Sequence, residues 1–374
     1  MTRPPSGRPL VVLVAPDSFK GSLTSVEVAR ALAAGWRRAR PSDELVLAPL
    51  ADGGEGTLAA IEAAGGWQRQ TVRVTDPLGR PVTARWLRSD DGTRAVVEMA
   101  EASGLSRVDA AERDPVAADS GGTGEVLCAV LDSGVRGIVL GIGGSATTDG
   151  GRGLLCALGL EAGETVRVDR LDGRLADVDL AVACDVSNPL LGDRGAAATY
   201  APQKGASPSQ VEGLDRRLAL WADDLESATG RRERDTPGAG AAGGVGFGLL
   251  AVQDRFRSFA LRPGVELVME ATGFDEKLAR ADIVITGEGR IDAQTAFGKT
   301  ALGVARRAAA RGARCIAVGG AVTPEGVEAL RDLATVVPVH ERPIAVEEAI
   351  AAGAAPVERA GERIARLVAA GSLP

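Results

Sequence analysis

Short aliphatic segments alternate with helical patterns at both ends of this 374-residue chain, and several of them lead directly into clusters of glycine and polar residues. Such alternation is typical of a parallel sheet whose strands are joined by crossover helices. In an open sheet of this kind, ligands bind beyond the carboxyl ends of the strands. Each cluster alone could be an ordinary turn, but together they favour one site. The clusters are APDSFKG (15–21), PLADGGEGT (49–57), GIGGSATTDGG (141–151), CDVSNPLLG (184–192) and TGEGRIDAQTAFGKT (286–300).

The N-terminal segment predicts a first α/β unit. An aliphatic run at 10–15 indicates a strand, and Thr24 and Glu27 then have the spacing of a helical capping box. A second strand is expected at 44–49, followed by a second helix that starts near residues 52–55 and runs to 64. The first helix should bury one face, made of Val28, Ala29, Leu32, Ala33 and Trp36.

The central part of the chain has a different pattern. Adjacent β patterns, with Asp90-Asp91-Gly92 as a hairpin turn, predict antiparallel pairing. The α/β alternation returns from residue 281 to a closing helix. The expected strands are 69–75, 81–89, 94–99, 137–141, 180–184, 281–286 and 313–319, and the expected helices include 208–228 and 298–311.

The length of the chain indicates more than one domain. A single hydrophobic core rarely grows beyond ~250–300 residues. The strand patterns place a mixed α/β domain at 69–280, inserted into a parallel-sheet α/β domain formed by 1–68 and 281–374. A charged stretch without apolar residues at 230–237 (GRRERDTP) predicts an exposed loop.

The charge balance and the counts of histidine and cysteine exclude several classes of function. Lys and Arg number 43 against 50 Asp and Glu, a net charge of -7, which makes nucleic acid and anionic membranes poor partners. The single histidine, His340, excludes His-rich zinc sites. The four cysteines form no CxxC pair and lie in or beside apolar runs, typical of reduced core residues. The first apolar run is too short for a signal peptide or a membrane span, so we expect a cytoplasmic protein.

Three glycine-rich segments resemble nucleotide-binding motifs, and the first of them matches GxGxxG letter for letter, but none fits both the pattern and its usual context. GAGAAG (238–243) follows a charged stretch instead of a strand, so a flexible loop or a helix start is the better interpretation. GIGGSA (141–146) follows a strand, which leaves open an NAD-dependent oxidoreductase of a small hydroxy acid, although no helix follows at once. GKT (298–300) is not a P-loop, because Ala293 stands where the first glycine should be.

The remaining polar residues fit phosphoryl transfer, which needs cations for the phosphates, carboxylates for magnesium and an acceptor hydroxyl held in line. Lys20 precedes a predicted helix N-terminus, where backbone N–H groups favour an anion. Several carboxylates follow predicted strands and could face one magnesium ion, although any one of them could instead be an N-cap or turn residue. They are Asp17, Asp52, Asp149, Asp185 and Asp292.

The chain also resembles the bacterial glycerate kinases that form 2-phosphoglycerate, over about residues 11–367. Besides the five clusters, the matching motifs are EMAEASGL (98–105), DSGGTGE (119–125), YAPQKGA (200–206) and GAGAAGGVGFGL (238–249). The resemblance implies a two-domain α/β kinase with a flavodoxin-like domain, a second domain inserted into it, and ATP and D-glycerate bound between them. We therefore expect ATP and Mg²⁺ as cofactors. An oxidoreductase and a non-catalytic sugar-acid-binding protein remain the alternatives.

Roles can be assigned to individual residues within this resemblance. Lys20 should contact the transferring phosphate, with Ser18 and the backbone of 21–24 beside it. Asp185 and Asp292 are candidates for the base and the magnesium ligand, with no choice between them. Arg290 is a candidate clamp for a carboxylate or phosphate, because a planar guanidinium binds such anions through two bonds. Further substrate or nucleotide contacts are expected from Asp17, Ser18, Asp52, Gly53, Gly54, Thr148, Asp149, Gly287, Glu288 and Lys299.

The residues alone do not choose between the two hydroxyl groups of glycerate. Phosphoryl transfer is decided mainly by positioning. If Arg290 or the glycine-rich helix start after Asp52 holds the carboxylate close to the reaction centre, the C2 oxygen is brought in line with the γ-phosphate. The resemblance points to the same product, 2-phosphoglycerate.

Overall fold

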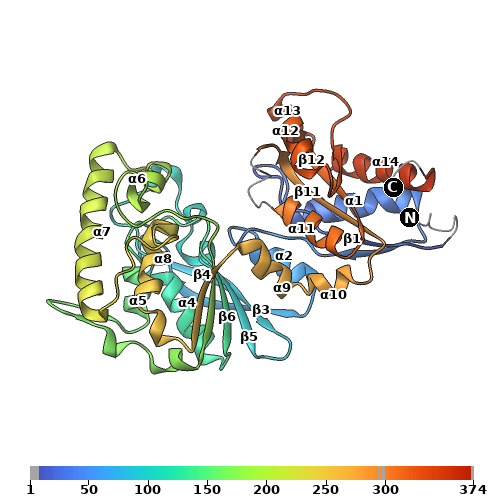
Figure 1. The fold of residues 1–374 in the computed structure, drawn as a ribbon. Helices are drawn as coiled ribbons and strands as arrows, with labels where there is room; N and C mark the ends of the chain where they lie inside the picture. Colours follow the sequence, from blue (N-terminus) through green and yellow to red (C-terminus); the bar gives the residue numbers. More distant parts are fainter. Residues whose placement is uncertain (1–7, 294, 296–299, 372–374) are drawn as a thin grey trace. The chain divides into compact units, whose positions relative to one another are not determined.

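The computed structural model describes residues 8–293, 295 and 300–371. The chain divides into two compact units, each of which can be followed in Figure 1. Unit 1 comprises Met1–Asp52, Ala59–Gly65 and Val268–Pro374, and unit 2 comprises Gly53–Leu58 and Gly66–Leu267. The chain passes between the units four times: after Asp52, after Leu58 within α2 (Thr57–Ala64), after Gly65, and after Leu267 within α9 (Gly264–Ala271).

Unit 1 is built on a five-stranded parallel sheet with the order β13-β12-β11-β1-β2. When its strands are numbered along the chain within this unit, the order is 2-1-3-4-5, that of flavodoxin-like folds. The expectation of a flavodoxin-like parallel sheet is confirmed. The strands are β1 (Val11–Val14), β2 (Glu44–Leu47), β11 (Ile283–Ile291), β12 (Arg314–Val322) and β13 (Thr335–Pro338).

The helix α1 (Ser25–Ala39) has the start and the buried face that its sequence predicts. The Thr24 side chain accepts a hydrogen bond from the backbone N–H of Glu27, and the Glu27 carboxylate accepts one from the N–H of Thr24, which makes a capping box. The predicted apolar face is fully buried and packs with α14 (Ala355–Ala369) against the sheet. The other helices of this unit are α10 (Phe274–Leu278), α11 (Thr300–Ala310), α12 (Pro324–Leu330) and α13 (Val346–Ala351).

Unit 2 contains a six-stranded mixed sheet with the order β10-β9-β6-β5-β4-β3. β10, β9, β6 and β5 are parallel, and β4 pairs antiparallel with both β5 and β3, so the predicted hairpin at residues 90–92 is confirmed. The strands are β3 (Trp67–Thr75), β4 (Pro81–Ser89), β5 (Arg94–Glu98), β6 (Gly137–Gly141), β9 (Asp179–Ala183) and β10 (Ser258–Arg262). A separate small sheet pairs β7 (Glu161–Ala162) with β8 (Val166–Arg167).

Helices cover one face of the unit 2 sheet in two layers. Figure 1 shows α4 (Gly121–Asp132), α5 (Arg152–Ala157) and α8 (Ala241–Ala251) beside the sheet, with the long helix α7 (Pro208–Thr229) outside them. Leu, Val and Phe side chains from the sheet and these helices form one buried core. Two short helices, α3 (Ala100–Ser103) and α6 (Ala196–Tyr200), complete the unit.

Two predicted boundaries at the strand ends are wrong. The second helix starts at Thr57, because Gly53 and Gly56 have positive φ angles of 86° and 94° that interrupt a helix. The strand β11 continues to Ile291 and pairs with β12, although the sequence suggested a loop after residue 286. A Cβ at Gly320 would lie 2.6 Å from the Gly289 carbonyl oxygen, so glycine permits this extended pairing.

The glycine tract at 238–248 forms a helix start and not a flexible loop. Gly240 precedes α8, and the tract is buried apart from the partly buried Ala242. Ala242, Gly243 and Gly244 have positive φ angles at the first turn. A Cβ at Gly243 would lie 1.9 Å from the carbonyl oxygen of Thr147, so a larger residue would push these two segments apart.

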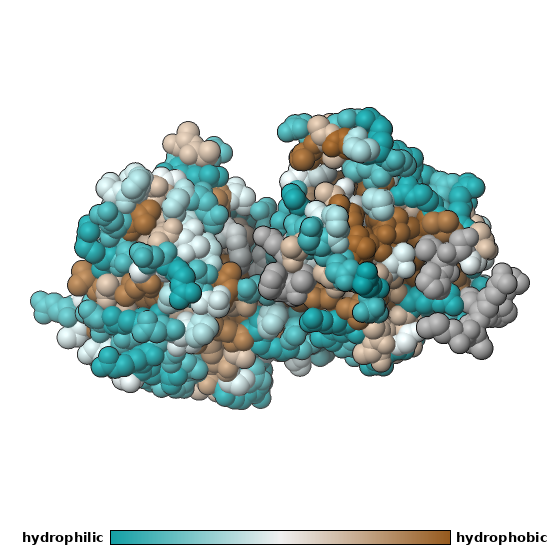
Figure 2. Space-filling model, turned by 45° about the horizontal axis from the view of Figure 1, so that its top comes forward, coloured by the Kyte–Doolittle hydropathy of each residue, from teal (hydrophilic) through white to brown (hydrophobic). Residues whose placement is uncertain are grey.

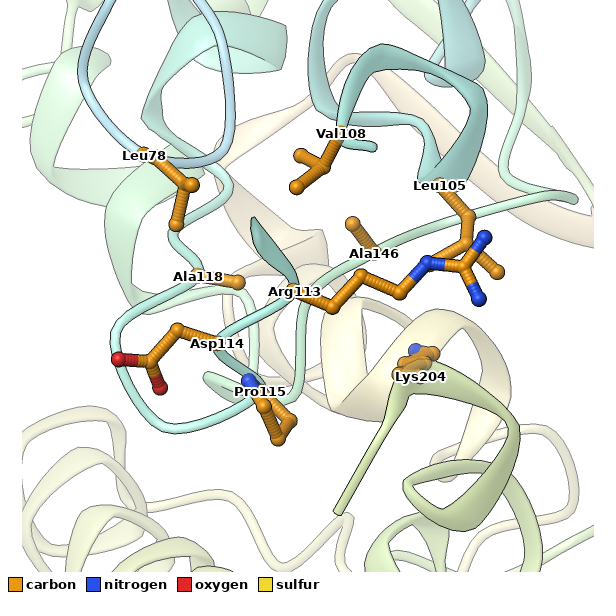
Figure 3. Close-up of a pocket in the computed structure, with 9 residues that line it drawn as sticks. All are labelled: Leu78, Leu105, Val108, Arg113, Asp114, Pro115, Ala118, Ala146 and Lys204. Carbon is orange, nitrogen blue, oxygen red and sulfur yellow. The ribbon is translucent and has the colours of Figure 1, made fainter. Parts of the chain in front are cut away.

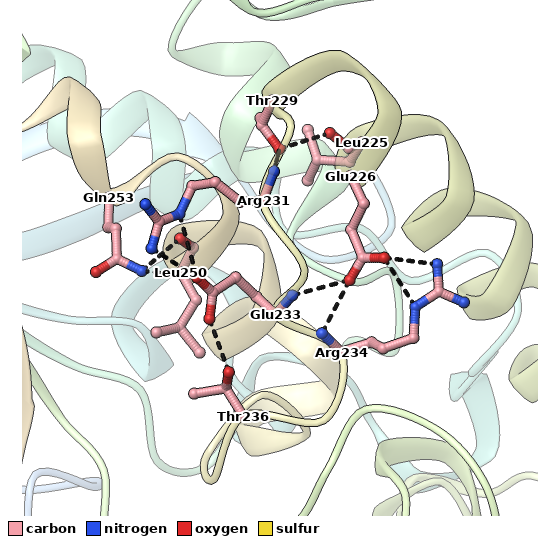
Figure 4. Close-up of polar contacts among 9 residues, drawn as sticks. All are labelled: Leu225, Glu226, Thr229, Arg231, Glu233, Arg234, Thr236, Leu250 and Gln253. Carbon is pink, nitrogen blue, oxygen red and sulfur yellow. Dashed lines mark hydrogen bonds and ion pairs between the residues drawn. The ribbon is translucent and has the colours of Figure 1, made fainter.

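The charged stretch at 230–237 is an anchored loop (Figure 4). The carboxylate of Glu226 in α7 accepts hydrogen bonds from the backbone N–H of Glu233 and Arg234 at 2.9 and 3.0 Å. The Arg234 guanidinium also donates to it, from Nε at 2.9 Å and Nη2 at 2.7 Å. Glu233 is buried, although the sequence predicted an exposed stretch, because it pairs with Arg231 and because Arg234 ties the segment to Glu226 of α7.

The remaining features of the fold concern its hydrophobic surface and its four cysteines. Across the described ranges, no helix has both the length and the apolar character needed to span a bilayer. Figure 2 shows apolar patches separated by larger polar areas on one face of the molecule. All four cysteines are free thiols, but only Cys315 is buried and Cys156 is exposed, so the expectation of core cysteines is wrong for Cys156.

Candidate active site

The loops of unit 1 that carry the predicted residues lie where the strand order reverses. β1 and β11 are neighbours, but the next strands along the chain lie on opposite sides of this pair. The loops beyond their carboxyl ends therefore diverge, and a ligand site is expected at such a point. Asp17 and Lys20 follow β1 directly, and Glu288 lies in the last part of β11.

Asp17 is held in place by hydrogen bonds of both its backbone and its side chain. Its backbone N–H donates to the carbonyl oxygen of Gly287 at 2.8 Å, which links the β1 loop to β11. Its carboxylate accepts hydrogen bonds from Thr300 Oγ1 at 2.7 Å and from the N–H of Ser18 at 2.6 Å. Burial raises the pKa of Asp17, the bond from Thr300 opposes this shift, and the nearby charge of Asp52 adds to it. Asp17 is thus a carboxylate placed to take up a proton or a cation.

Lys20 lies at the tip of a tight loop between β1 and α1. The backbones of Phe19 and Leu23 bond each other in both directions, at 2.8 and 3.0 Å, and close this loop. The Lys20 ammonium lies 3.2 Å from Asp52 Oδ2, and the charge of Asp52 raises the pKa of Lys20. Because its side chain is 81% exposed, Lys20 can reach an anion in solvent.

The backbone beside Lys20 is less open than predicted. The N–H groups of Ser22 and Leu23 both donate to the carbonyl oxygen of Phe19, and that of Thr24 donates to Glu27. The α1 N-terminus is therefore occupied by its own capping box. Of the phosphate contacts predicted in this loop, the exposed Lys20 side chain is therefore better supported than the backbone N–H groups, which already have partners.

Residues of β11 and the turn after it form a second group. Glu288 is buried, and its Oε1 accepts a hydrogen bond from Thr295 Oγ1 at 3.0 Å. Thr295 Oγ1 also accepts from the N–H of Asp292 at 3.2 Å, which ties the turn to the strand. Arg290 is mostly exposed, and its Nε lies 3.1 Å from Asp292 Oδ2. A Cβ at Gly289 would lie 3.2 Å from the Cα of Phe19, so glycine permits this close contact.

Lys299 lies outside the described residues. The structure resumes at Thr300, the first residue of α11, whose hydroxyl binds Asp17.

Gly53 and Gly54 belong to unit 2, where they lie against the ends of β6 and β9. The Gly53 carbonyl oxygen accepts a hydrogen bond from the N–H of Gly143 at 3.3 Å. A Cβ at Gly143 would lie 2.6 Å from the Cα of Gly54, and one at Gly53 would lie 2.3 Å from the Cβ of Ala183. Such close backbone packing explains why glycines gather in both segments.

Asp185 lies just beyond β9, at the start of a helix. Its Oδ1 accepts a hydrogen bond from the N–H of Gly264, the first residue of α9, at 3.0 Å. A carboxylate at a helix N-terminus is favoured by the free N–H groups and the helix dipole. Asp185 therefore has a capping role, whatever else it binds.

Asp149 accepts hydrogen bonds from neighbouring residues of unit 2, and Thr148 is buried. Asp149 Oδ2 accepts hydrogen bonds from the Ser120 hydroxyl at 2.6 Å and from the N–H groups of Ser120 and Gly153, both at 3.0 Å. Thr148 is 3% exposed, and its buried Oγ1 has no hydrogen-bond partner within the described part of the chain. These contacts order the loop between β6 and α5.

Sequence reasoning assigned no role to Lys204, which anchors the same loop. Its ammonium nitrogen donates to the Thr147 carbonyl at 2.6 Å and to Ser145 Oγ at 2.9 Å. Burial lowers the pKa of Lys204 to about 7. Figure 3 shows this lysine below a cavity lined also by Arg113, Leu105, Val108 and Ala146, with room for roughly one water molecule. The sequence signal that could have pointed to Lys204 is its charge within the otherwise uncharged segment YAPQKGA.

The predicted residues thus form two groups. Unit 1 brings together Asp17, Ser18, Lys20 and Asp52, with Gly287, Glu288, Arg290 and Asp292 on or after β11. Unit 2 contains Gly53, Gly54, Thr148, Asp149 and Asp185. Among the described residues, no group of three or more His, Cys, Asp or Glu side chains could hold a metal by itself.

Comparisons with known proteins agree over the length of the chain. The model of the glycerate kinase family matches residues 12–369. A glycerate kinase of Halalkalibacterium halodurans is 44% identical over 95% of this chain and 97% of its own length. The glycerate 2-kinase of Escherichia coli is 42% identical over 84% of this chain and 86% of its own. The crystal structure of a candidate glycerate kinase 2 from Salmonella typhimurium LT2 has a TM-score of 0.83 and 40% identity, covering 98% of this chain and 100% of that one. This chain is therefore a kinase that belongs to the glycerate kinase family.

Proposed function

We propose that the protein transfers the γ-phosphate of ATP to the C2 hydroxyl of D-glycerate, giving 2-phospho-D-glycerate and ADP. The observation that carries the proposal is the group around Lys20, Asp17 and Asp52 at the reversal of strand order, in a chain whose relatives are named for this substrate. An exposed cation beside two carboxylates fits a phosphate that arrives with its own metal ion.

The charges of the group suit a bound nucleotide. Lys20 would leave Asp52 for a phosphate oxygen, since it is exposed and its ion pair with Asp52 lies at the surface. A cation aimed at the transferring group stabilises the charge that builds up in the transition state. Asp52 would be left to hold the metal or the glycerate hydroxyls.

Magnesium fits this donor set. Mg²⁺ is usually held by one or two carboxylates together with substrate phosphates and water, so three protein carboxylates are not required. Asp185 and Asp292 remain our candidates for the magnesium ligand and the base, and Asp17 is a further carboxylate able to face the ion. When bound, the ion would neutralise charge on the β- and γ-phosphates.

The regiochemistry follows from where the substrate carboxylate is anchored. Arg290 is exposed and paired only at Nε with Asp292 among the ion pairs described, so its guanidinium can turn a second edge to a carboxylate. A carboxylate held next to the reaction centre places the neighbouring C2 oxygen in line with the phosphate.

The free thiols support a reducing compartment, and we propose the cytoplasm as the location.

Two measurements test the proposal. Purified protein with ATP, Mg²⁺ and D-glycerate should release ADP, and omission of glycerate should reduce release to the ATPase background. The product should give a phosphorus NMR doublet, since one proton is bound to C2; a dominant triplet would show transfer to C3. Glycerate binding by calorimetry without any ADP release would instead identify a non-catalytic binding protein.

A further inference from the structure

Glu98, the last residue of β5, is a buried carboxylate that has been given no role so far. It is 3% exposed. Its Oε1 accepts a hydrogen bond from the N–H of Gly56 at 3.1 Å, and its Oε2 accepts one from the N–H of Leu58 at 3.0 Å. Both oxygens are therefore bound to one short segment that lies 40 or more residues away in the sequence.

The two donors belong to the start of α2. The first N–H groups of a helix have no partner within the helix, and a negative charge is favoured beside them. No Ser, Thr, Asp or Asn occupies the position before Thr57, where Gly56 stands instead. Glu98 supplies from a neighbouring strand the acceptor that the segment itself lacks.

This contact fixes more than the helix end. Gly53 and Gly54, which precede α2, lie against the ends of β6 and β9, and Glu98 is the direct neighbour of Gly141 in the parallel pair β5–β6. A Cβ at Gly141 would lie 2.5 Å from the Gly53 carbonyl oxygen. The segment 53–58 is thus held by glycine packing at one end and by the Glu98 carboxylate at the other.

The surroundings of Glu98 do not favour its ionised form. It forms no salt bridge within the described part of the chain, whereas the nearby Glu101 pairs with Arg85 and Arg107. Burial, and to a smaller extent the charges of Glu101 and Glu55, raises the pKa of Glu98 to about 7, against the bonds from Leu58 and Gly56. Because the pKa of Glu98 is about 7 in the folded chain against 4.5 for an unburied glutamate, stability is lost as the pH rises from 4.5 to about 7 and is not regained above it, which is unexpected for a residue with only a structural role.

We propose that Glu98 is a positioning residue for the phosphoryl transfer, whose ionised carboxylate holds the segment 53–58, next in the chain to Asp52, in its active conformation. The inference rests on the proposed function, since it assigns that segment to the site. A protonated carboxyl can accept well at only one of its two oxygens, so protonation releases one of the two N–H groups.

Hydrogen exchange tests the anchoring without any activity measurement. In the wild-type protein, protection of the peptide that covers 53–58, corrected for intrinsic rates, should fall as the pH is lowered from 8 to 6. Glu98→Gln should lower this protection at least about tenfold at pH 8, because it replaces one charged acceptor with an amide donor. Protection that is independent of pH in the wild type and unchanged in the variant would overturn the proposal.

Kinetics and melting separate positioning from a general structural role. Glu98→Gln should lower kcat at least about tenfold and remove the limb near pH 7 from the wild-type profile of kcat/KM, while its melting temperature at pH 8 does not fall. Glu98→Asp should recover part of kcat. The matched control is Glu101→Gln, a buried carboxylate with arginine partners, which should keep the limb near pH 7.

Loss of activity together with a lower melting temperature and an unchanged pH profile would show that Glu98 has only a structural role. Absence of glycerate turnover in the wild type would refute the proposed function, and the exchange experiment would still decide whether Glu98 anchors the segment.

Discussion

Thr300 Oγ1 donates a hydrogen bond of 2.7 Å to Asp17 Oδ2, although 283 residues separate the two in the sequence. The bond joins the first residue of α11 to the loop after β1. Asp17 is a partly buried acid whose pKa is raised by its surroundings, and this hydroxyl is the strongest influence in the opposite direction. The charge of Asp17 therefore depends on a residue brought to it by the sheet.

Replacing Thr300 with Val should make Asp17 harder to ionise. Without the hydrogen bond, the pKa of Asp17 rises further, so the acid limb of the kcat/KM profile should move to higher pH. We also expect about tenfold lower kcat/KM at pH 7, the usual effect of removing a hydrogen bond to a charged group. Thr300→Ser is the control and should restore the wild-type profile. A Val variant with an unshifted acid limb would show that Asp17 does not titrate in the reaction.

Removal of the Lys20 charge should reduce turnover strongly. We expect Lys20→Ala to lower kcat by ~10²–10³, typical of losing one electrostatic donor to the transition state. Lys20→Arg should retain part of kcat, since it keeps the charge. The fold should be unaffected, because Lys20 is exposed and paired at the surface with Asp52. Steady-state kinetics and circular dichroism measure both expectations, and nearly normal turnover of Lys20→Ala would refute the role.

Lys204 should give the protein a stability that increases with pH. Its pKa is about 7 in the folded state against 10.5 for an unburied lysine, so between these values the unfolded state binds a proton that the folded state does not. Stability should therefore rise with pH across this window and be lost as pH falls towards 7. The difference between wild type and Lys204→Met should change by about 1 kcal/mol per pH unit.

Urea unfolding between pH 7.5 and 9.5 measures this slope, with fluorescence of Trp67, Trp86 and Trp221 as reporters in unit 2. Lys20→Ala is the matched control, because it removes an exposed lysine and should keep the wild-type slope. Equal slopes for wild type and Lys204→Met would mean that the buried amine is charged.

Gly35 should tolerate no side chain in the contact between α1 and α14. A Cβ at Gly35 would lie 1.8 Å from the carbonyl oxygen of Glu358, so Gly35→Ala must push the helices apart. We expect unit 1 to lose about 1–3 kcal/mol, as for other overpacked cores. Gly213→Ala is the control: Gly213 lies within α7 with nothing near its Cβ position, and alanine there should stabilise the protein by up to about 1 kcal/mol. Urea unfolding of both variants should show opposite signs, and a neutral Gly35→Ala would contradict the packing.

Local patterns predicted much of the secondary structure. The capping box of α1 and its buried face, the strand β6 and the helix α7 agree with the sequence because each depends on contacts within a few residues. The end of β11 and the start of α2 were misplaced. The first depends on pairing with another strand, and the second depends on positive φ angles at two glycines.

The candidate site was predicted as a set of segments but not as a set of contacts. Asp17, Lys20 and Asp52 were selected because each follows a predicted strand, and they do lie together. Glu98, Thr300 and Lys204 received no role, although all three lie in motifs that were noticed. Nothing local distinguishes a buried carboxylate from an exposed one in such a motif.

The sequence by itself determined the class of fold, the alternation of strands and helices, the family and the segments that carry the chemistry, because these depend on periodicity, capping and long ordered motifs. Only the tertiary structure decided which polar groups come into contact. The strand order 2-1-3-4-5 brings Thr300 to Asp17, and the pairing of β5 with β6 brings Glu98 to the start of α2. Burial then shifts the pKa values of Asp17, Glu98 and Lys204. Burial and long-range hydrogen bonds are properties of the packed chain, so no local pattern of residues encodes them.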